Sequence, residues 1–468
     1  LAPSAAVAAV HPTVAPVEAA VVERRGTATI VVLWSVAIAM VIVAATQLLT
    51  WRTAVLGRTS IARVQARWAA RAGVEQVIAT LAYHTQSPDE DDPMALIRAL
   101  EQDWSGTLET GSWDIRHVSE GEEYAGPLDE HSRLCLSWIN AMHLAEFEHM
   151  GLDTIDAIRD WTDEDSEIQG LGAEQSFYDG RGMGYRPRNA DFKSVAELEL
   201  VAGAFAEYVR GEDWNLNNRL DPNENDGEDS IPPDDADDSL RGGWASLVTA
   251  HSRTSPLSHS GYPRINLRET DAEELMEAIG IDEDQANALL EWGQTPEAVL
   301  GTLLVVDLAE LGGGTSSSSS RTTGRSSSAS RSREPSVYPL ESDELAKIFA
   351  EVTLDTFEGP LPVPGKVNLN TAGPEVLRIL FGGDAAIAES VMALRNSSAE
   401  GISSIVELLE IRRVAPEDVA ALSDKIDVHS YVFAVTSRGK APTGQEVEIF
   451  VILDRSTLPV TILEYREG

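Results

Sequence analysis

An uncharged apolar stretch near the amino terminus constrains this chain more than any other feature. No residue between Arg25 and Arg52 carries a formal charge. Residues 27–49 are 23 in number, enough to cross a hydrocarbon core about 30 Å thick as one helix. Because Arg24 and Arg25 precede the stretch, the positive-inside tendency keeps that end in the cytoplasm. The sequence therefore predicts a single-pass membrane anchor with the bulk of the chain on the far side.

The helix is expected to continue beyond the membrane as an amphipathic stalk, so that one helix spans residues 27–83. Apolar residues recur there at steps of three and four, as on one face of a helix. They are Ile61, Val64, Trp68, Ala72, Ile78 and Leu81. A secretory signal has an apolar core of only about 7–15 residues before a small-residue cleavage site, so a membrane helix fits better.

Charge and cysteine content exclude several classes of function. The chain has 36 basic and 76 acidic residues, a formal net charge of −40, which repels phosphate backbones and anionic headgroups. The single cysteine, Cys135, permits no intrachain disulfide and no cysteine-rich metal site. The sequence contains no phosphate-binding loop, nucleophile elbow or dinucleotide fingerprint. We therefore expect a protein that is not an enzyme.

The two ends of the part beyond the membrane are predicted to form one sheet packed on the stalk. Alternating or apolar runs typical of strands occur at 111–118, 431–437, 446–453 and 459–465. The fold class is therefore α+β: residues 84–132 and 426–468 form an α/β body, and 133–425 form a large, all-α insertion. Inside the insertion, the serine-rich tract 312–335 is predicted to be a disordered linker.

Internal repeats occupy the insertion. Two copies share an Asn flanked by apolar residues and a glycine 14 positions later: Asn266 with Gly280, and Asn368 with Gly382. A looser third copy has Cys135 in place of the Asn, and its glycine is Gly151. Each copy predicts a helix, a glycine turn and a second helix, which is the helix-hairpin-helix (SAM-like) pattern. The repeat regions are 133–211, 263–305 and 366–425.

Such hairpins often bind DNA, because their backbone N–H groups meet a phosphate. In this chain an aspartate follows each glycine: Asp153, Asp282 and Asp384. A carboxylate near a phosphate costs about 1 kcal/mol per contact even in high dielectric. The repeats are therefore expected to serve packing and protein contacts. A membrane-anchored helix-hairpin-helix DNA receptor resembling competence proteins is the alternative.

The acidic region 213–238 begins with EF-hand spacing. Oxygen-bearing side chains occupy positions 1, 3, 5, 9 and 12, and position 7 offers a backbone carbonyl, as calcium requires. These residues are Asp213, Asn215, Asn217, Asp221 and Glu224, with the carbonyl from Arg219. Asn218 stands at position six, where glycine is usual, and asparagine tolerates the left-handed conformation. The alternative is an Asn/Asp-rich surface turn.

A second candidate calcium site consists of Asp163, Asp165 and Glu174 around a predicted helix end, with Asp160 as a further ligand. Clustered carboxylates repel one another, and a divalent cation converts that repulsion into loop order. Two other interpretations are open. Acidic loops are commonly just solvated, and a hydrolase could use the carboxylates of 160–174.

The amino-terminal pattern resembles the leader and first helix of type IV pilins and type II secretion pseudopilins. The resemblance rests on Arg24, Arg25 and Gly26, which precede an uncharged helix that runs into a soluble domain. This resemblance implies that 1–26 is a leader, that a prepilin peptidase cleaves after Gly26, and that Thr27 becomes methylated. The fifth mature residue is Val31 instead of the usual glutamate, as in the K-type minor pseudopilins. A plain membrane anchor with a basic flank is the alternative.

Further motifs resemble the general secretion pathway protein K family. They are DWTDED at 160–165, GAE at 172–174, YRPRNADFKSVAEL at 185–198 and VNLNTA at 367–372. The resemblance implies a calcium-binding minor pseudopilin in the inner membrane, with its bulk in the periplasm. It would sit at the tip of a type II secretion pseudopilus and support assembly and protein export across the outer membrane. The implied partners are minor pseudopilins of the I and J types, the pseudopilus and the prepilin peptidase, with no nucleic acid.

Overall fold

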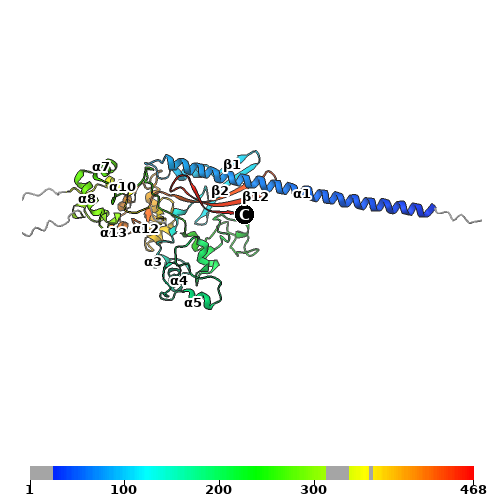
Figure 1. Ribbon diagram of the computed structural model, residues 1–468, viewed down its shortest axis with the longest axis horizontal. Coiled ribbons are helices and arrows are strands. Elements are labelled where there is room, and N and C mark those ends of the chain that lie inside the picture. Colours follow the sequence, from blue (N-terminus) through cyan, green and yellow to red (C-terminus); the bar gives the residue numbers. More distant parts are fainter. Residues whose placement is uncertain (1–24, 312–336, 358–361) are drawn as a thin grey trace, which may run out of the picture. The chain divides into compact units, whose positions relative to one another are not determined.

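The computed structural model describes residues 25–311, 337–357 and 362–468 (Figure 1). The predicted serine-rich linker and residues 1–24 of the predicted leader lie outside these ranges. The chain divides into two compact units, 1–61 and 62–468. One helix, α1 (Arg25–Gln86), forms the described part of the first unit and continues into the second.

In the first unit, α1 has the composition of a membrane span. Its apolar part reaches a mean hydropathy of 2.6, and none of that part is buried. Among the described residues, this is the one helix long and apolar enough to cross a membrane. The side chain of Val31 is 64 % exposed, as expected for a surface that would face lipid.

The second unit contains a seven-stranded antiparallel sheet in the order β1-β2-β11-β12-β13, with β3 paired to β2 and β4 paired to β11. The four predicted strands are present as β2, β11, β12 and β13. Because Ser437 pairs with Ile115, the two ends of the chain meet in one sheet, as predicted. The bounds are β1 (Ser105–Leu108), β2 (Gly111–Ser119), β3 (Glu122–Ala125), β4 (Leu128–Asp129), β11 (Val432–Lys440), β12 (Glu446–Asp454) and β13 (Thr461–Glu467).

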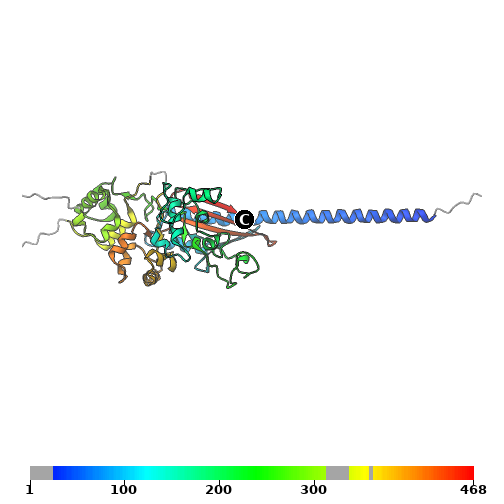
Figure 2. The ribbon, with the colours of Figure 1, turned by 90° about the horizontal axis from the view of Figure 1, so that it is seen from below.

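The carboxyl-terminal part of α1 packs on this sheet through small residues (Figures 1 and 2). Ala66 and Ala70 are fully buried, and Ser437 of β11 donates a hydrogen bond to the Ala70 carbonyl at 2.8 Å. We call this contact the alanine face; it comprises Ala62, Ala66, Ala69, Ala70 and Gly73 of α1. Of the six residues that the sequence placed on the apolar side of the stalk, Ile61, Val64 and Trp68 are exposed, whereas Ala72, Ile78 and Leu81 pack on the sheet further along the helix. Close backbone approach requires small side chains, which explains the difference.

The insertion shows a structural repeat that the sequence only partly indicated. Each repeat begins at a two-residue strand, and this strand pairs in parallel with another two-residue strand far along the chain. The pairs are β5 (Leu134–Cys135) with β6 (Val248–Thr249), β7 (Ile265–Asn266) with β8 (Val352–Thr353), and β9 (Val367–Asn368) with β10 (Ile426–Asp427). We call the segments that these pairs close the first, second and third modules.

Within each module, two helices are followed by a 3₁₀ helix and a further helix. The first module has α3 (Ala141–Leu144), α4 (Leu152–Thr162), η2 (Val195–Leu200) and α6 (Ala206–Arg210), with α5 (Gln175–Gly180), η3 (Pro222–Glu224) and η4 (Trp244–Ser246) in addition. The second has α7 (Ala272–Ile279), α8 (Glu283–Gly293), η5 (Leu300–Leu304) and α9 (Leu308–Leu311), followed by α10 (Ser342–Glu351). The third has α11 (Pro374–Leu380), α12 (Ala385–Arg395), η6 (Ile405–Glu410) and α13 (Pro416–Leu422). The helix α2 (Ala95–Gln102) and η1 (Glu130–Ser132) belong to the body.

The glycine turns differ between modules. Gly280 and Gly382 adopt left-handed conformations at helix ends, with φ of 90° and 66°. Gly151 is extended instead and caps the start of α4, because α3 has already ended at Leu144. The helix-hairpin-helix assignment therefore stays a prediction for the second and third modules, and the first departs from the expected tight turn.

The buried cores group the modules. Residues of the first and third modules share one apolar core, in which Leu134 and Val367 are fully buried. The second module has its own core around Leu267 and Leu289, and its elements α7, α8 and α10 lie together in Figure 1. The helix-sheet core beneath α1 contains Leu81, among others.

The alanine face yields a test of the fold. A Cβ added at Gly439 of β11 would lie 2.0 Å from the Ala66 carbonyl oxygen and 2.3 Å from the Ala70 nitrogen, both backbone atoms. Gly439→Ala is therefore expected to destabilise the 62–468 unit by about 1–3 kcal/mol, the usual cost of overpacking. Thermal unfolding of the detergent-solubilised chain, followed by circular dichroism, measures the effect.

The matched control is Gly184→Ala. Gly184 has no atom within 4 Å of an added Cβ, so its unfolding midpoint should stay within error of the wild-type value. Equal midpoints for Gly439→Ala and wild type would contradict the close helix-strand packing.

Candidate functional site

The first predicted metal site lies where α4 ends and α5 begins. Asp163 and Asp165 follow the last residue of α4, and Glu174 is the N-cap of α5. Each of the three offers a carboxylate oxygen, and these oxygens lie within 4.8 Å of one another. The fold thus brings together the three carboxylates that the sequence proposed as calcium ligands.

Three oxygens at this site are buried and lack hydrogen-bond partners: Asp160 Oδ2, Asp163 Oδ1 and Glu174 Oε1. The other oxygen of each carboxylate is engaged. Asp160 Oδ1 accepts from the Gln169 amide at 3.0 Å, Asp163 Oδ2 from Gln169 Nε2 at 2.7 Å, and Glu174 Oε2 from the Gln175 amide at 3.3 Å. Buried polar atoms are rarely left unpaired. The orphaned oxygens therefore fit a hard divalent cation, which binds oxygen ligands.

The electrostatics point the same way. Burial raises the pKa of Asp160, Asp163 and Glu174 above their ordinary values. Repulsion from neighbouring carboxylates adds to the effect, with Asp165 acting on both Asp163 and Glu174. Because these charges repel, the cluster is expected to bind either protons or a cation.

The second predicted site, the loop 213–224, has the turn that an EF-hand loop requires. Asn218 at position six is left-handed, with φ of 57°, as predicted for a glycine substitute. Asp213 at position one accepts hydrogen bonds at 3.0 Å from the backbone amides of Asn217 and Asn218. Glu224 at position twelve accepts from the backbone amides of Trp214 and Asp221, which closes the loop.

The oxygens of this loop are not gathered as closely as those at 163–174. The side-chain oxygens of Asn215 and Asn217 accept backbone N–H groups, and Asp221 Oδ2 accepts from both asparagine amides. Within the described ranges, the loop's acids do not form a group of three with ligand atoms inside 4.8 Å. Cation binding there would require these side chains to exchange partners.

The loop is fastened to the sheet of the body. Val118 of β2 donates its amide to the Asn218 carbonyl at 2.7 Å, and Thr436 of β11 donates to the Asn217 carbonyl at 2.6 Å. Arg219 forms an ion pair of 2.5 Å with Asp114 of β2. Order in the loop is therefore coupled to the contact between the first module and the sheet.

Burial raises the pKa of Asp213 to about 6 and that of Glu224 to about 7. Repulsion between these two carboxylates contributes to the rise at Glu224. The loop thus holds two acids that resist ionisation in the absence of a cation.

In the second and third modules, the acidic turns do not present free helix N-termini to phosphate, whereas α4 of the first module has no side-chain cap. Asp282 accepts the Gln285 amide at 2.8 Å and caps α8, and Asp384 accepts the Ala386 amide at 2.9 Å and caps α12. The carboxylates occupy the positions that a DNA phosphate would need.

A third group of ligand-type side chains escaped the sequence analysis: His259, Asp427 and His429. His259 and Asp427 are 168 residues apart, so no local spacing could have revealed the group.

Comparison with known proteins identifies the segment that contains the 163–174 cluster. Residues 141–211 match the family model of "Type II secretion system (T2SS), protein K". The matched segment includes both α4 and the three carboxylates at 163–174. The resemblance drawn from the motifs in 160–198 is thereby confirmed, and the protein K domain supports a minor pseudopilin role in type II secretion. The DNA-receptor alternative is not favoured.

The chain was also compared with curated proteins and with solved structures. No curated protein matches the chain. Among solved structures, the chain is similar to one from the GspK-GspI-GspJ complex of the enterotoxigenic Escherichia coli type 2 secretion system. The identity is 12 %, the TM-score is 0.45, and the match covers 89 % of this chain and 99 % of that one.

The raised pKa values in the loop 213–224 predict how the metal-free protein responds to pH. Between pH 4.5 and about 7, Asp213 and Glu224 keep protons in the folded protein that they release in the unfolded chain, so their contribution to the free energy of unfolding falls as pH rises. Glu224→Gln removes one such group. In a chelating buffer, the variant should therefore unfold at a higher temperature than wild type at pH 7, and the gap should close toward pH 4.5.

Glu228→Gln, at an exposed acid of the same region, is the control and should show no such gap. A Glu224→Gln variant that is less stable than wild type at pH 7 in chelator would show that the Glu224 charge stabilises the loop.

Proposed function

We propose that this protein is a non-enzymatic minor pseudopilin of the K type, located at the tip of a type II secretion pseudopilus. The protein K domain at 141–211 is the observation that carries the proposal. In this role the protein supports pseudopilus assembly and thereby the export of proteins across the outer membrane.

The apolar helix supports an inner-membrane location, with residues beyond Arg52 in the periplasm. Its amino-terminal basic pair, Arg24 and Arg25, favours a cytoplasmic start. We infer that a prepilin peptidase cleaves after Gly26 and that Thr27 is then methylated, leaving Val31 as the fifth residue. Without a carboxylate at that position, the helix cannot neutralise the terminal amine of a neighbouring subunit, which suits a subunit that ends a filament.

The exposed side of α1 supports packing against other subunits. Ile61, Val64 and Trp68 have exposed fractions of 62 %, 53 % and 58 %, while the alanine face of the same helix is buried on the sheet. An exposed apolar surface of this kind marks an interaction site. Helices of other minor pseudopilins, of the I and J types, are the partners we expect there.

We further propose that calcium orders the acidic loops. Asp163, Asp165 and Glu174, with Asp160, would hold one ion; the unpartnered oxygens support this assignment. Asp213, Asn215, Asn217, Asp221 and Glu224, with the Arg219 carbonyl, would hold another after exchange of their hydrogen-bond partners. The cation supplies positive charge, and the residues of the chain supply the turn, the burial and the attachment to the sheet. Such a role is structural and involves no hydrolysis by the carboxylates of 160–174.

Processing and partnership test the pseudopilin role directly. Mass spectrometry of protein extracted from membranes of the native host is expected to find an amino terminus at N-methylated Thr27. The same extract should retain other minor pseudopilins on affinity purification. A Gly26→Leu variant should block both processing and entry into the complex.

An intact residue 1 in the membrane-extracted protein would contradict the proposal. So would retention of duplex DNA by the purified protein in a gel shift at low salt, because the acidic turns predict no binding.

Calcium binding is tested by thermal unfolding in chelator and in excess calcium. Calcium should raise the midpoint, since a ligand at a hundredfold excess over its dissociation constant stabilises by about 2.7 kcal/mol. Asp163→Asn combined with Glu174→Gln should remove much of this increase. It should also stabilise the metal-free protein, because it removes repelling charges.

Asp191→Asn, an exposed acid of the same domain, is the matched control and should respond to calcium like wild type. An identical calcium response in the double variant would exclude the 163–174 site.

A further inference from the structure

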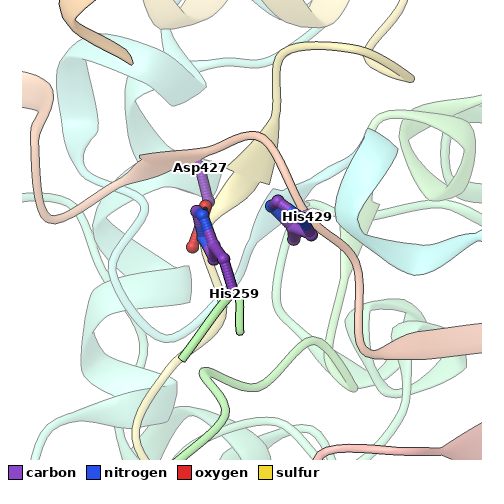
Figure 3. A group of neighbouring side chains, drawn as sticks. All are labelled: His259, Asp427 and His429. Carbon is purple, nitrogen blue, oxygen red and sulfur yellow. Dashed lines mark hydrogen bonds and ion pairs between the residues drawn. The ribbon is translucent and has the colours of Figure 1, made fainter. Parts of the chain in front are cut away.

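Three side chains with metal-binding groups meet outside the acidic sites, at the junction of the modules (Figure 3). His259 lies on the connection between β6 and β7, Asp427 is the last residue of β10, and His429 follows it by two residues. Each offers one ligand atom, and the three atoms lie within 4.8 Å of one another.

The contacts within the group leave one nitrogen unused. His259 Nε2 and Asp427 Oδ1 form a hydrogen bond of 3.1 Å. The rings of His259 and His429 lie 3.8 Å apart between centroids. His429 Nδ1 is buried and has no hydrogen-bond partner. An unpaired buried nitrogen is costly, so it requires an explanation.

A neutral imidazole has a lone pair to donate to a metal, and the unpartnered Nδ1 of His429 is an atom that could donate it.

We propose that His259, Asp427 and His429 bind a divalent transition-metal ion of the zinc class. Two imidazoles and one carboxylate are ligands that zinc accepts, and zinc commonly takes water as a fourth ligand when the protein provides three. A cavity of about 20 Å³ adjoins His259 and Asp427, which is enough for one water molecule. Calcium prefers oxygen ligands, so this site would differ in specificity from the acidic sites.

The neighbours of Asp427 divide its two oxygens. Oδ2 faces the Arg264 guanidinium at 3.9 Å, while Oδ1 accepts the Val428 amide at 2.7 Å and faces His259 Nε2 at 3.1 Å. Metal binding through Oδ1 would leave the contact with Arg264 intact, as an outer-shell partner that orients the carboxylate. The cationic Arg264, Lys366 and Arg455 lie close by and oppose a further positive charge. The ion should therefore be removable by chelators.

The position of the site indicates a structural role for the ion, which would link two parts of the chain. The His259 amide donates to the Ala350 carbonyl in α10 at 3.4 Å, so His259 is tied to the second module. Asp427 and His429 belong to the end of the third module and the approach to β11. A bound ion would fasten the second module to the segment that enters the sheet.

The experiment uses the full chain in detergent, stripped with a chelator and then supplied with excess calcium to occupy the acidic sites. Zinc alone is added, unbound metal is removed by gel filtration, and metal content and unfolding temperature are measured. Wild type should retain one zinc per chain and unfold at least ~2 °C higher than without zinc. Cobalt in place of zinc should give the visible absorption of a four-coordinate site.

His429→Gln should lose the bound zinc and the temperature shift, while its calcium response stays like that of wild type. His429 makes no side-chain hydrogen bond through Nδ1, so this variant is expected to fold even where His259→Gln does not. His149→Gln, at an exposed histidine, is the control and should bind zinc normally.

Each other outcome overturns the proposal. Wild type without zinc after gel filtration would show that the group does not bind it. Equal retention of zinc by His429→Gln and wild type would place the metal elsewhere. Both results are independent of membrane processing and of pseudopilin partners, so they leave the proposed function untouched.

Discussion

Close contact between the alanine face of α1 and strand β11 is the interaction on which the described body depends. Gly439 lets the backbone of β11 approach Ala66 and Ala70 of the helix, and no larger residue would fit without displacement. β11 also pairs with β2 and β12, so it joins the amino-terminal and carboxyl-terminal parts of the sheet. Where the helix buries its alanines on the sheet, Ile61, Val64 and Trp68 stay exposed for other helices, while Val74, Val77 and Leu81 pack on the sheet further along. One packing choice thus serves both the fold and the proposed assembly.

The second constraint is negative charge. A net charge of −40 must be accommodated, and the first module buries several acids instead of exposing them. Asp160 and Glu174 are buried among other carboxylates, and Asp213 and Glu224 are buried where a loop meets the sheet. Burial of repelling carboxylates is unfavourable unless protons or cations compensate it. The calcium ions that we propose would supply this compensation in the first module, and the loop 213–224 would transmit their effect to the sheet.

Much of the architecture could be predicted from the sequence, because it depends on patterns among residues that are close in sequence. The apolar run predicted the long helix, and alternating or apolar runs predicted the strands β2, β11, β12 and β13. The acidic motif around the end of α4 suggested that Asp163, Asp165 and Glu174 would lie together, and their carboxylate oxygens lie within 4.8 Å of one another. The alanine face was missed because helical periodicity highlights large apolar residues, whereas close packing depends on small ones. His259 and His429 were missed because their proximity arises only when strands distant in sequence pair.

The parallel two-residue strands explain why an insertion of this size leaves the sheet intact. Each pair, such as Asn266 opposite Thr353, brings the start and the end of a module side by side. The chain therefore leaves a module close to the point where it entered. The third pair places Asp427 opposite Asn368, five residues before β11 begins. Any shift at that pair would be passed directly to β11 and hence to the alanine face. A junction with that position benefits from additional cross-links, and the contacts of His259 and Arg264 with Asp427 provide them from a separate segment of the chain.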